Sequence, residues 1–405
     1  MNKELLQVLN PIQVEDGVVR IDMHSYQSQA TGLNNNDEIQ FIINNQDIFT
    51  LPHESVLQIE GKLMKADGST PTTSALANHG LAFLFSEVRY VINDIVIDMT
   101  RNVGMTSLMK LYPSYSEEES KTLSMAGWCP NSSNNWLVHT DGTFTGFLPL
   151  KLLLGFAEDH KRIILNARQS LYLVRDRSDY NALKGASDQV IDSKIQLLRL
   201  LWKVPHVTLS DRKKLSMLNL VQKDKALPIA FRSWCLHEYP LLPTTDTHSW
   251  SVKSARSTER PLYVIIGFQT NRKYQQSKDV TLFDHIHLRN IRLFLNNVCF
   301  PYEGLELNFS KNKFGPLYDR FAKFQSSYYE KQDCPMLSPQ GFKAKAPLIV
   351  FDCSYLEESM KITTIDLRVD FETQENVPDH TSAYCLIIHA RQVKYHPLSN
   401  YVTSM

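Results

Sequence analysis

One ten-residue pattern occurs twice in this chain, about half its length apart. "VRYVINDIVI" covers residues 88–97 and "IRLFLNNVCF" covers residues 291–300 of 405. Both alternate apolar residues around a basic residue and a polar pair. The matching positions are Arg89 with Arg292, and Asn93-Asp94 with Asn296-Asn297. The recurrence indicates that one local structure occurs in both halves of the chain.

Period-2 alternation of apolar and polar residues dominates the chain, and it predicts half-buried β-strands. In "TIDLRVDF", Ile365, Leu367, Val369 and Phe371 alternate with charged residues. Other predicted strands are 56–63, 170–176, 262–269 and 383–395. Helical patterns are few and short, at 107–125, 149–163 and 315–329. A chain of this length with so little helix is predicted to be all-β.

The polar pair in the repeated pattern predicts a hairpin turn. Asn and Asp tolerate the left-handed backbone conformation that type I′ turns require. Each copy of the pattern is therefore expected to be a strand, a two-residue turn and a second strand.

Three further pairs of segments occur in the same order in both halves. Gly61 in "LQIEGKL" matches Gly267 in "YVIIGFQ", and "LLRLLWKVP" (197–205) matches "IIHARQVKYHP" (387–397), with Lys203 near Lys394. "GFLPLKLLLGFAEDHKRI" matches "GFKAKAPLIVFDCSYLEESMKI"; its paired positions are Pro149-Leu150 with Pro347-Leu348 and Lys161 with Lys361. We interpret the order as a tandem duplication; the alternative is two generic β-domains with similar hairpins. The predicted domains are residues 1–205 and 206–405, each an eight-stranded jelly roll with a few short helices in its loops.

Composition excludes several classes of function. Lys plus Arg equals Asp plus Glu, so the chain lacks the basic excess typical of nucleic-acid-binding proteins. Six dispersed cysteines form no CxxC pair, which argues against a zinc ribbon. The first residues resemble neither a signal peptide nor a membrane span, and we expect synthesis in a reducing, intracellular compartment.

No catalytic constellation is predicted. The sequence contains no Gly-rich phosphate loop, GxSxG or HExxH motif. Asp284, His285 and His287 are the best metal candidates, but on the predicted strand the carboxylate lies on the opposite face from the two imidazoles. Glu117, Glu118 and Glu119 are expected at a solvated helix start, and His206 is interpreted as an interdomain polar contact. We therefore assign no catalytic, cofactor-binding or metal-binding residue.

The strand faces in the repeated pattern are informative. Val91 follows Arg89 on the second face of its strand, and Phe294 follows Arg292. Apolar residues there predict that the second face is covered, by the other jelly roll, a long loop or another subunit. Aspartate at either apolar position should then prevent folding or assembly. A change at Asp366, on a solvated face, should be tolerated.

In the pattern and order of its segments, the chain resembles the double jelly-roll major capsid proteins of adenoviruses, tailless membrane-containing phages, virophages and Polinton-type elements. The resemblance rests on pattern and order in these stretches: 51–63, 85–98, 148–159, 202–211, 231–243 ("FRSWCLHEYPLLP") and 260–273. It implies a homotrimer that forms a pseudo-hexameric capsomer of an icosahedral shell around double-stranded DNA.

The same resemblance implies location in the virion capsid, after synthesis and assembly inside the host cell. The implied partners are neighbouring capsomers, penton proteins and minor capsid proteins, with at most weak contact to nucleic acid. Residues 1–13 are a candidate contact to a minor protein or membrane, and the resemblance leaves open whether an internal membrane is present.

Two alternatives remain on sequence grounds. A lectin-like double sandwich would need an exposed aromatic platform, whereas the five tryptophans are scattered; they are Trp128, Trp136, Trp202, Trp234 and Trp250. A two-jelly-roll hydrolase would need acids facing each other across the cleft between domains.

Overall fold

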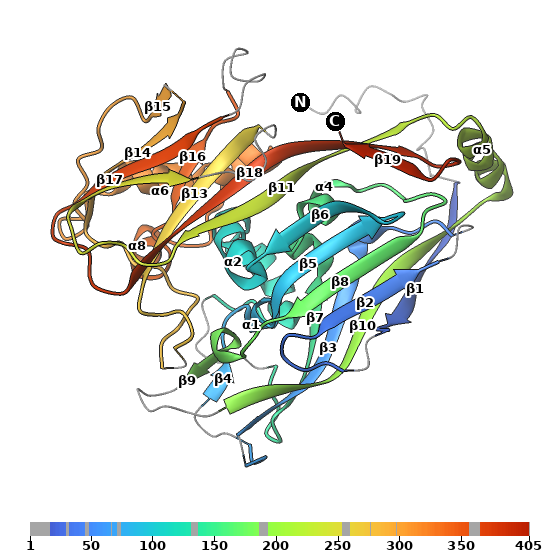
Figure 1. Cartoon of the computed structure of the whole chain (residues 1–405), viewed down its shortest axis with the longest axis horizontal. Helices are drawn as coiled ribbons and strands as arrows, with labels where there is room; N and C mark the ends of the chain where they lie inside the picture. The colour runs from blue at the N-terminus through green and yellow to red at the C-terminus, as the bar shows by residue number, and fades with distance from the viewer. Residues whose placement is uncertain are drawn as a thin grey trace, which may run out of the picture.

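The computed structural model describes most of the chain. The described residues are 17–29, 32–44, 48–65, 67–70, 74–130, 137–185, 193–252, 260–275, 277–296, 298–355 and 365–404. Strands form two pairs of antiparallel sheets, one in each half of the chain (Figure 1).

The first half forms a sandwich of two four-stranded sheets, which we call the first roll. Its first sheet contains, in spatial order, β1 (Val18–Gln27), β10 (Ser193–Leu209), β3 (Val56–Lys65) and β7 (Thr143–Pro149). Its second sheet contains β2 (Glu38–Ile43), β8 (Gln169–Arg175), β5 (Phe85–Ile92) and β6 (Ile95–Arg101).

The second half, the second roll, repeats this strand order. Its first sheet contains β11 (Leu227–Tyr239), β18 (Thr381–His396), β13 (Pro261–Thr270) and β16 (Ile349–Asp352), with β19 (Tyr401–Ser404) beside β18. Its second sheet contains β12 (Thr247–Val252), β17 (Leu367–Thr373), β14 (Leu288–Leu295) and β15 (Val298–Phe300). In both rolls the first main strand pairs with the last, as in a jelly roll. The predicted fold class is confirmed.

Alternating side chains of the facing sheets form the core of each roll. In β3 every second residue from Leu57 to Leu63 is buried. Aromatic pairs join the two sheets: Phe41 contacts Trp202 in the first roll, and Phe268 contacts Phe371 in the second. These contacts define the inner face of each sheet, and we call the opposite face of β1-β10-β3-β7, or of β11-β18-β13-β16, its outer face.

Helices occupy the same connection in each roll. Between β6 and β7 lie α2 (Val103–Ser114), α3 (Glu117–Thr122) and η2 (Ser124–Ala126). Between β15 and β16 lie α6 (Gly315–Ala322), α7 (Phe324–Tyr329) and α8 (Pro339–Lys345). We call these groups the first and second helical inserts. They match the helical segments expected at 107–125 and 315–329.

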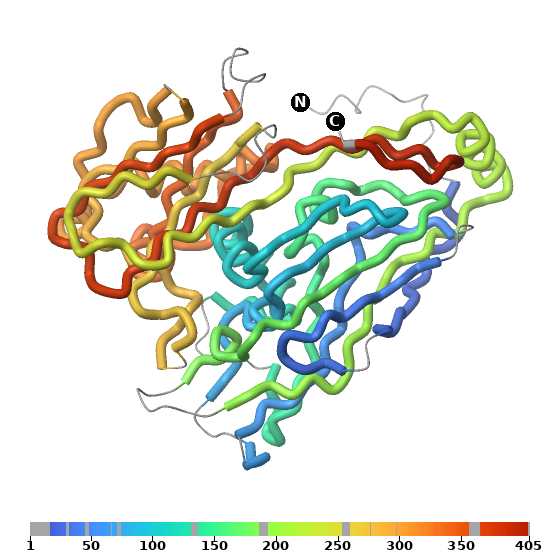
Figure 2. Tube along the Cα trace, viewed as in Figure 1, coloured from blue at the N-terminus to red at the C-terminus, as the bar shows by residue number. Residues whose placement is uncertain are grey.

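Shorter elements complete the fold. They are η1 (Pro52–Glu54), β4 (Ser74–Leu76), α1 (Gly80–Phe83), η3 (Leu150–Leu152), α4 (Gly155–Asp159), η4 (Tyr180–Ala182) and β9 (Leu183–Gly185). Between the rolls, β10 continues through Pro205 to Leu209, and α5 (Asp211–Gln222) leads to β11. The tube in Figure 2 shows this link at one end of the molecule. A division between residues 205 and 206 stays a prediction.

The repeated pattern forms the same hairpin in both rolls. β5 pairs with β6, and β14 pairs with β15. Asn93 and Asn296 both have positive φ, at 47° and 52°, and Asp94 has φ 63°; residue 297 lies outside the described part. Each Asn also bonds twice to the residue that precedes the neighbouring strand. Asn93 accepts from the amide of Arg168 and donates to its carbonyl, as Asn296 does with Asp366.

The other matched segments agree less closely. Gly61 and Gly267 lie on corresponding strands, β3 and β13, but they face opposite sides. Gly61 faces the core, whereas Gly267 is on the outer face, because its neighbour Phe268 points into the core against Phe371. Lys203 and Lys394 lie on the corresponding strands β10 and β18. The Gly-Phe match is wrong: Gly146-Phe147 lies in β7, whereas Gly341-Phe342 lies in α8. The strand order is therefore the same in both halves, whereas the local register of these matched segments differs. Lys361 lies outside the described residues.

Candidate functional site

The metal candidates do not lie on a strand, which corrects the prediction. His285, Ile286 and His287 form a turn before β14, and Ile286 and His287 have φ values of 42° and 51°. The amide of His287 donates to His285 Nδ1, 3.1 Å away, and Asp284 is paired with Arg272 at 2.6 Å. Burial, assisted by His287, lowers the pKa of His285. In the part of the chain that the structure describes, no group of three or more metal-ligating side chains is found.

The acidic cluster begins a helix, as expected, but one of its members is not simply solvated. Ser116 and Glu119 form a reciprocal capping box at the start of α3. Glu119 also pairs with Lys331 of the second roll at 2.7 Å. Hydrogen bonds from Lys331 and Ser116 outweigh burial and lower the pKa of Glu119. Glu119 therefore contributes to the contact between the rolls.

His206 was expected at an interdomain contact, and this is wrong. Its ring stacks on His24 at 3.9 Å, and its Nε2 lies 2.9 Å from the hydroxyl of Tyr26. Both neighbours belong to β1 of the first roll. Burial, together with the nearby His24, lowers the pKa of His206 to about 4.

The junction between the rolls contains a buried lysine. Lys110 of α2 has 3% of its side chain exposed. Its ammonium donates to Glu158 Oε1 at 3.1 Å and to the hydroxyl of Tyr329 at 2.6 Å, and it lies 4.0 Å from the ring centre of Tyr328. Burial lowers the pKa of Lys110 to about 8, with Glu158 opposing the shift. The carboxylate that pairs with the ammonium belongs to the first roll, and the tyrosines that surround it belong to the second roll.

A second ion pair lies beside the lysine. Arg232 of β11 donates to both carboxylate oxygens of Asp159 in α4, at 2.9 and 2.5 Å. Its guanidinium lies 3.5 Å from the ring centre of Tyr328. The helix approaches the strand closely because residue 155 is glycine: a Cβ there would lie 1.7 Å from the carbonyl oxygen of Arg232. This close approach brings Arg232 and Asp159 into bidentate contact.

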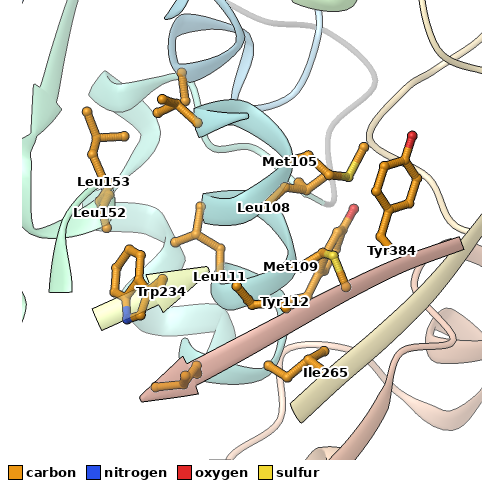
Figure 3. Close-up of a cluster of buried hydrophobic side chains, with 14 of the residues drawn as sticks. Met105, Leu108, Met109, Leu111, Tyr112, Leu152, Leu153, Trp234, Ile265 and Tyr384 are labelled. Atoms are coloured by element: carbon orange, nitrogen blue, oxygen red, sulfur yellow. The ribbon is translucent and has the colours of Figure 1, made fainter. Parts of the chain in front are cut away.

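The first helical insert covers the outer face of the second roll. Every residue of α2 is buried, and Figure 3 shows Met105, Met109 and Tyr112 directed at Ile265 and Tyr384. The Tyr112 hydroxyl donates to the carbonyl of Thr281 at 3.0 Å. Together with α7 of the second roll, which packs on Tyr263, α2 buries β13 on both faces from Tyr263 to Gln269. The arrangement joins the rolls into one unit.

Sequence reasoning did not find this junction. Lys110 is the only charged residue of α2, between Met109 and Leu111. A single lysine in an otherwise apolar helix was the available signal. Its partners Tyr328 and Tyr329 are more than half the chain length away, so spacing gives no indication of them.

The tryptophans form no exposed platform within the described residues. Trp128, Trp202, Trp234 and Trp250 are buried, and Trp136 lies outside the described part. No helix in the described ranges is long and apolar enough to cross a membrane.

Fold and junction define a class of protein: chains that contain two jelly rolls packed in tandem. A family model described as "Double jelly roll-like domain" matches residues 74–393. The chain belongs to this family. No curated protein matches the sequence.

Solved structures share the fold across the chain. A chain of the Sputnik virophage structure is 10% identical, with a TM-score of 0.65 over 99% of this chain and 91% of its own. The Faustovirus major capsid protein is 9% identical, with a TM-score of 0.60 over 95% and 92%. The mavirus major capsid protein is 11% identical, with a TM-score of 0.57 over 100% and 93%. The resemblance to double jelly-roll major capsid proteins is confirmed.

Proposed function

We propose that this protein is a structural major capsid protein. Three copies form a pseudo-hexameric capsomer, and many capsomers build an icosahedral shell around double-stranded DNA. Family membership and the likeness to viral capsid proteins over nearly the whole chain support this role. Its location is then the virion capsid, after assembly inside the host cell.

The junction between the rolls is the observation that carries the proposal. A capsomer tile must keep its two rolls in one orientation, because each roll occupies one of six positions around a ring. Lys110, Glu158, Arg232 and Asp159 meet this need with directional contacts in a buried setting. Buried polar contacts specify one orientation more strictly than an apolar surface does.

The role is non-enzymatic. In the junction, Lys110 and Glu158 are engaged with each other and with tyrosines, so they are committed to holding the rolls. The partners are other copies of this chain, penton proteins and minor capsid proteins. Zero net charge suits a tile that contacts other tiles more than DNA.

Native mass spectrometry and negative-stain microscopy of the purified chain test the proposal. We expect a species of three times 46.6 kDa, seen as pseudo-hexagonal particles. A chain that stays monomeric at high concentration would contradict it. The lectin-like alternative gains no support from the buried tryptophans.

A further inference from the structure

The corresponding sheets of the two rolls differ in what covers their outer faces. In the second roll β13 is buried on both faces: α2 of the first roll packs near Ile265, and α7 of the second roll packs on Tyr263. In the first roll β3 alternates between buried and partly exposed residues, and no helix in the described part of the chain covers its outer face in this way. Among the described residues, one sheet of the repeat thus has a helix of the other roll on its outer face, and the corresponding sheet does not.

The bare side of the first roll carries exposed apolar residues on β1. Val19, Ile21 and Met23 are 66%, 51% and 53% exposed. Ile21 and Met23 share the outer face, opposite Val207 and Pro205 of β10. β1 forms one edge of its sheet, since β10 is its neighbour on one side only. We call these three residues the β1 strip.

The second roll has a complementary hollow. A cavity of about 530 Å³ is bounded by β16, the end of β15, α6 and α7. Phe300, Phe324 and Phe351 line it with Arg320, whose guanidinium lies 5.8 Å from the ring centre of Phe351. Tyr355 at its rim is 94% exposed. Figure 1 shows β1 and β15 at opposite ends of the molecule.

The contact inside the chain shows how such surfaces meet. There β11, the first strand of the second roll, packs against β6, α2 and α4 of the first roll. β1 is the counterpart of β11, and the hollow includes the end of β15 and the helices α6 and α7, which correspond to β6 and the first helical insert. The internal contact therefore joins unlike surfaces, and in the described part of the chain the corresponding β1 strip and hollow have no such contact.

We propose that the β1 strip of one copy packs against the hollow of a second copy. The inference rests on the proposed capsid function and names the surfaces that join the copies. A contact between unlike surfaces is head-to-tail, and it closes into a ring if the rotation permits. If the contact between copies repeats the one between the rolls, three copies close a ring of six rolls.

The test uses two surface variants of the whole chain. Ile21→Asp with Met23→Asp places charges on the β1 strip, and Lys323→Glu with Tyr355→Asp alters the rim of the hollow. Ile21 and Met23 are 51% and 53% exposed, and Lys323 and Tyr355 are 64% and 94% exposed, so each variant should fold. Leu241→Asp, at a 57% exposed residue outside both surfaces, is the matched control. Thermal melting checks folding, with Met23→Ser and Tyr355→Ser as milder substitutes.

Sedimentation velocity then gives the association state. We expect the parent and the control to be trimers, and each double variant to associate about 100-fold more weakly or worse, because each places charge in a contact that buries apolar side chains. Mixing the two variants should give a 1:1 dimer, since one intact strip then meets one intact hollow. That dimer is specific to a head-to-tail contact.

The outcomes separate this inference from the proposed function. A trimeric parent whose folded double variants remain trimeric would overturn the inference and leave the capsid role standing. Two monomeric variants that give no dimer on mixing would also overturn the pairing of strip with hollow. A parent that never associates contradicts both.

Discussion

The two rolls share a strand order but differ in burial. β13 is buried on both faces, whereas the corresponding β3 is buried on one. β11 packs against the first roll, whereas the corresponding β1 is exposed along nearly its whole length. The repeat thus specifies the same sandwich twice, and the neighbours of each sandwich decide which outer surfaces enter a core.

The repeated hairpin shows the same contrast at single residues. Val91 is 6% exposed, so its face is covered within the chain, as predicted. Phe294 is only partly buried, with the guanidinium of Arg368 4.4 Å from its ring centre. The predicted cover is therefore confirmed at Val91 within the chain, and at Phe294 cover by another subunit stays a prediction.

The largest expected effect comes from breaking the junction between the rolls. Lys110→Met leaves Glu158 buried without its cation, which should lower the free energy of unfolding by about 3–5 kcal/mol. Lys121→Met is the control, because Lys121 is 67% exposed and pairs with Glu118 on the same helix, α3; it should cost below about 1 kcal/mol. Urea unfolding measures both. Equal losses would show that the junction does not hold the rolls together.

An intermediate effect should separate the two hairpins. Val91→Asp places a carboxylate in a buried position, where it must stay neutral or draw in water, at a cost of about 2–4 kcal/mol. Phe294→Asp should cost the single chain less than about 1.5 kcal/mol, because its face is open to solvent. Thermal melting of both variants, with Asp366→Asn as the tolerated change, checks this order. A more damaging Phe294 variant would reverse the comparison.

The smallest expected effect is a pH dependence from the first roll. Burial lowers the pKa of His79 from 6.5 to about 3, so the unfolded chain takes up the proton first as the pH falls. Stability from neutral His79 is therefore lost below pH 6.5, by about 2 kcal/mol between about pH 7 and pH 5.

His79→Asn, which keeps a residue suited to the left-handed backbone at φ 59°, should flatten this slope. His285→Asn in the second roll should change it less, because His285 lies in a partly exposed turn. Urea unfolding at the two pH values gives the slopes. An unchanged slope in the His79 variant would exclude this residue as the source.

The order of elements was open to prediction because its causes are local. Alternation along β3 and β17, and Asn in the hairpins, depend on residues adjacent in the chain. The register within the repeat was harder to predict from sequence. Gly341 lies in a helix whereas its match Gly146 lies in a strand, and Gly267 faces outward whereas its match Gly61 faces the core. The predicted strand for His285 and His287 failed because two left-handed residues make it a turn.

By itself the sequence determined an all-β chain, two copies of one sandwich, and the hairpin turns in each, because hydrophobic period and turn chemistry act over a few residues. Only the tertiary structure decided the junction, the covered face of β13 and the bare face of β1. Lys110 and Tyr329 are 219 residues apart, and no short-range pattern records that they meet. Such contacts follow from how two finished sandwiches fit together, which depends on the shape of whole surfaces.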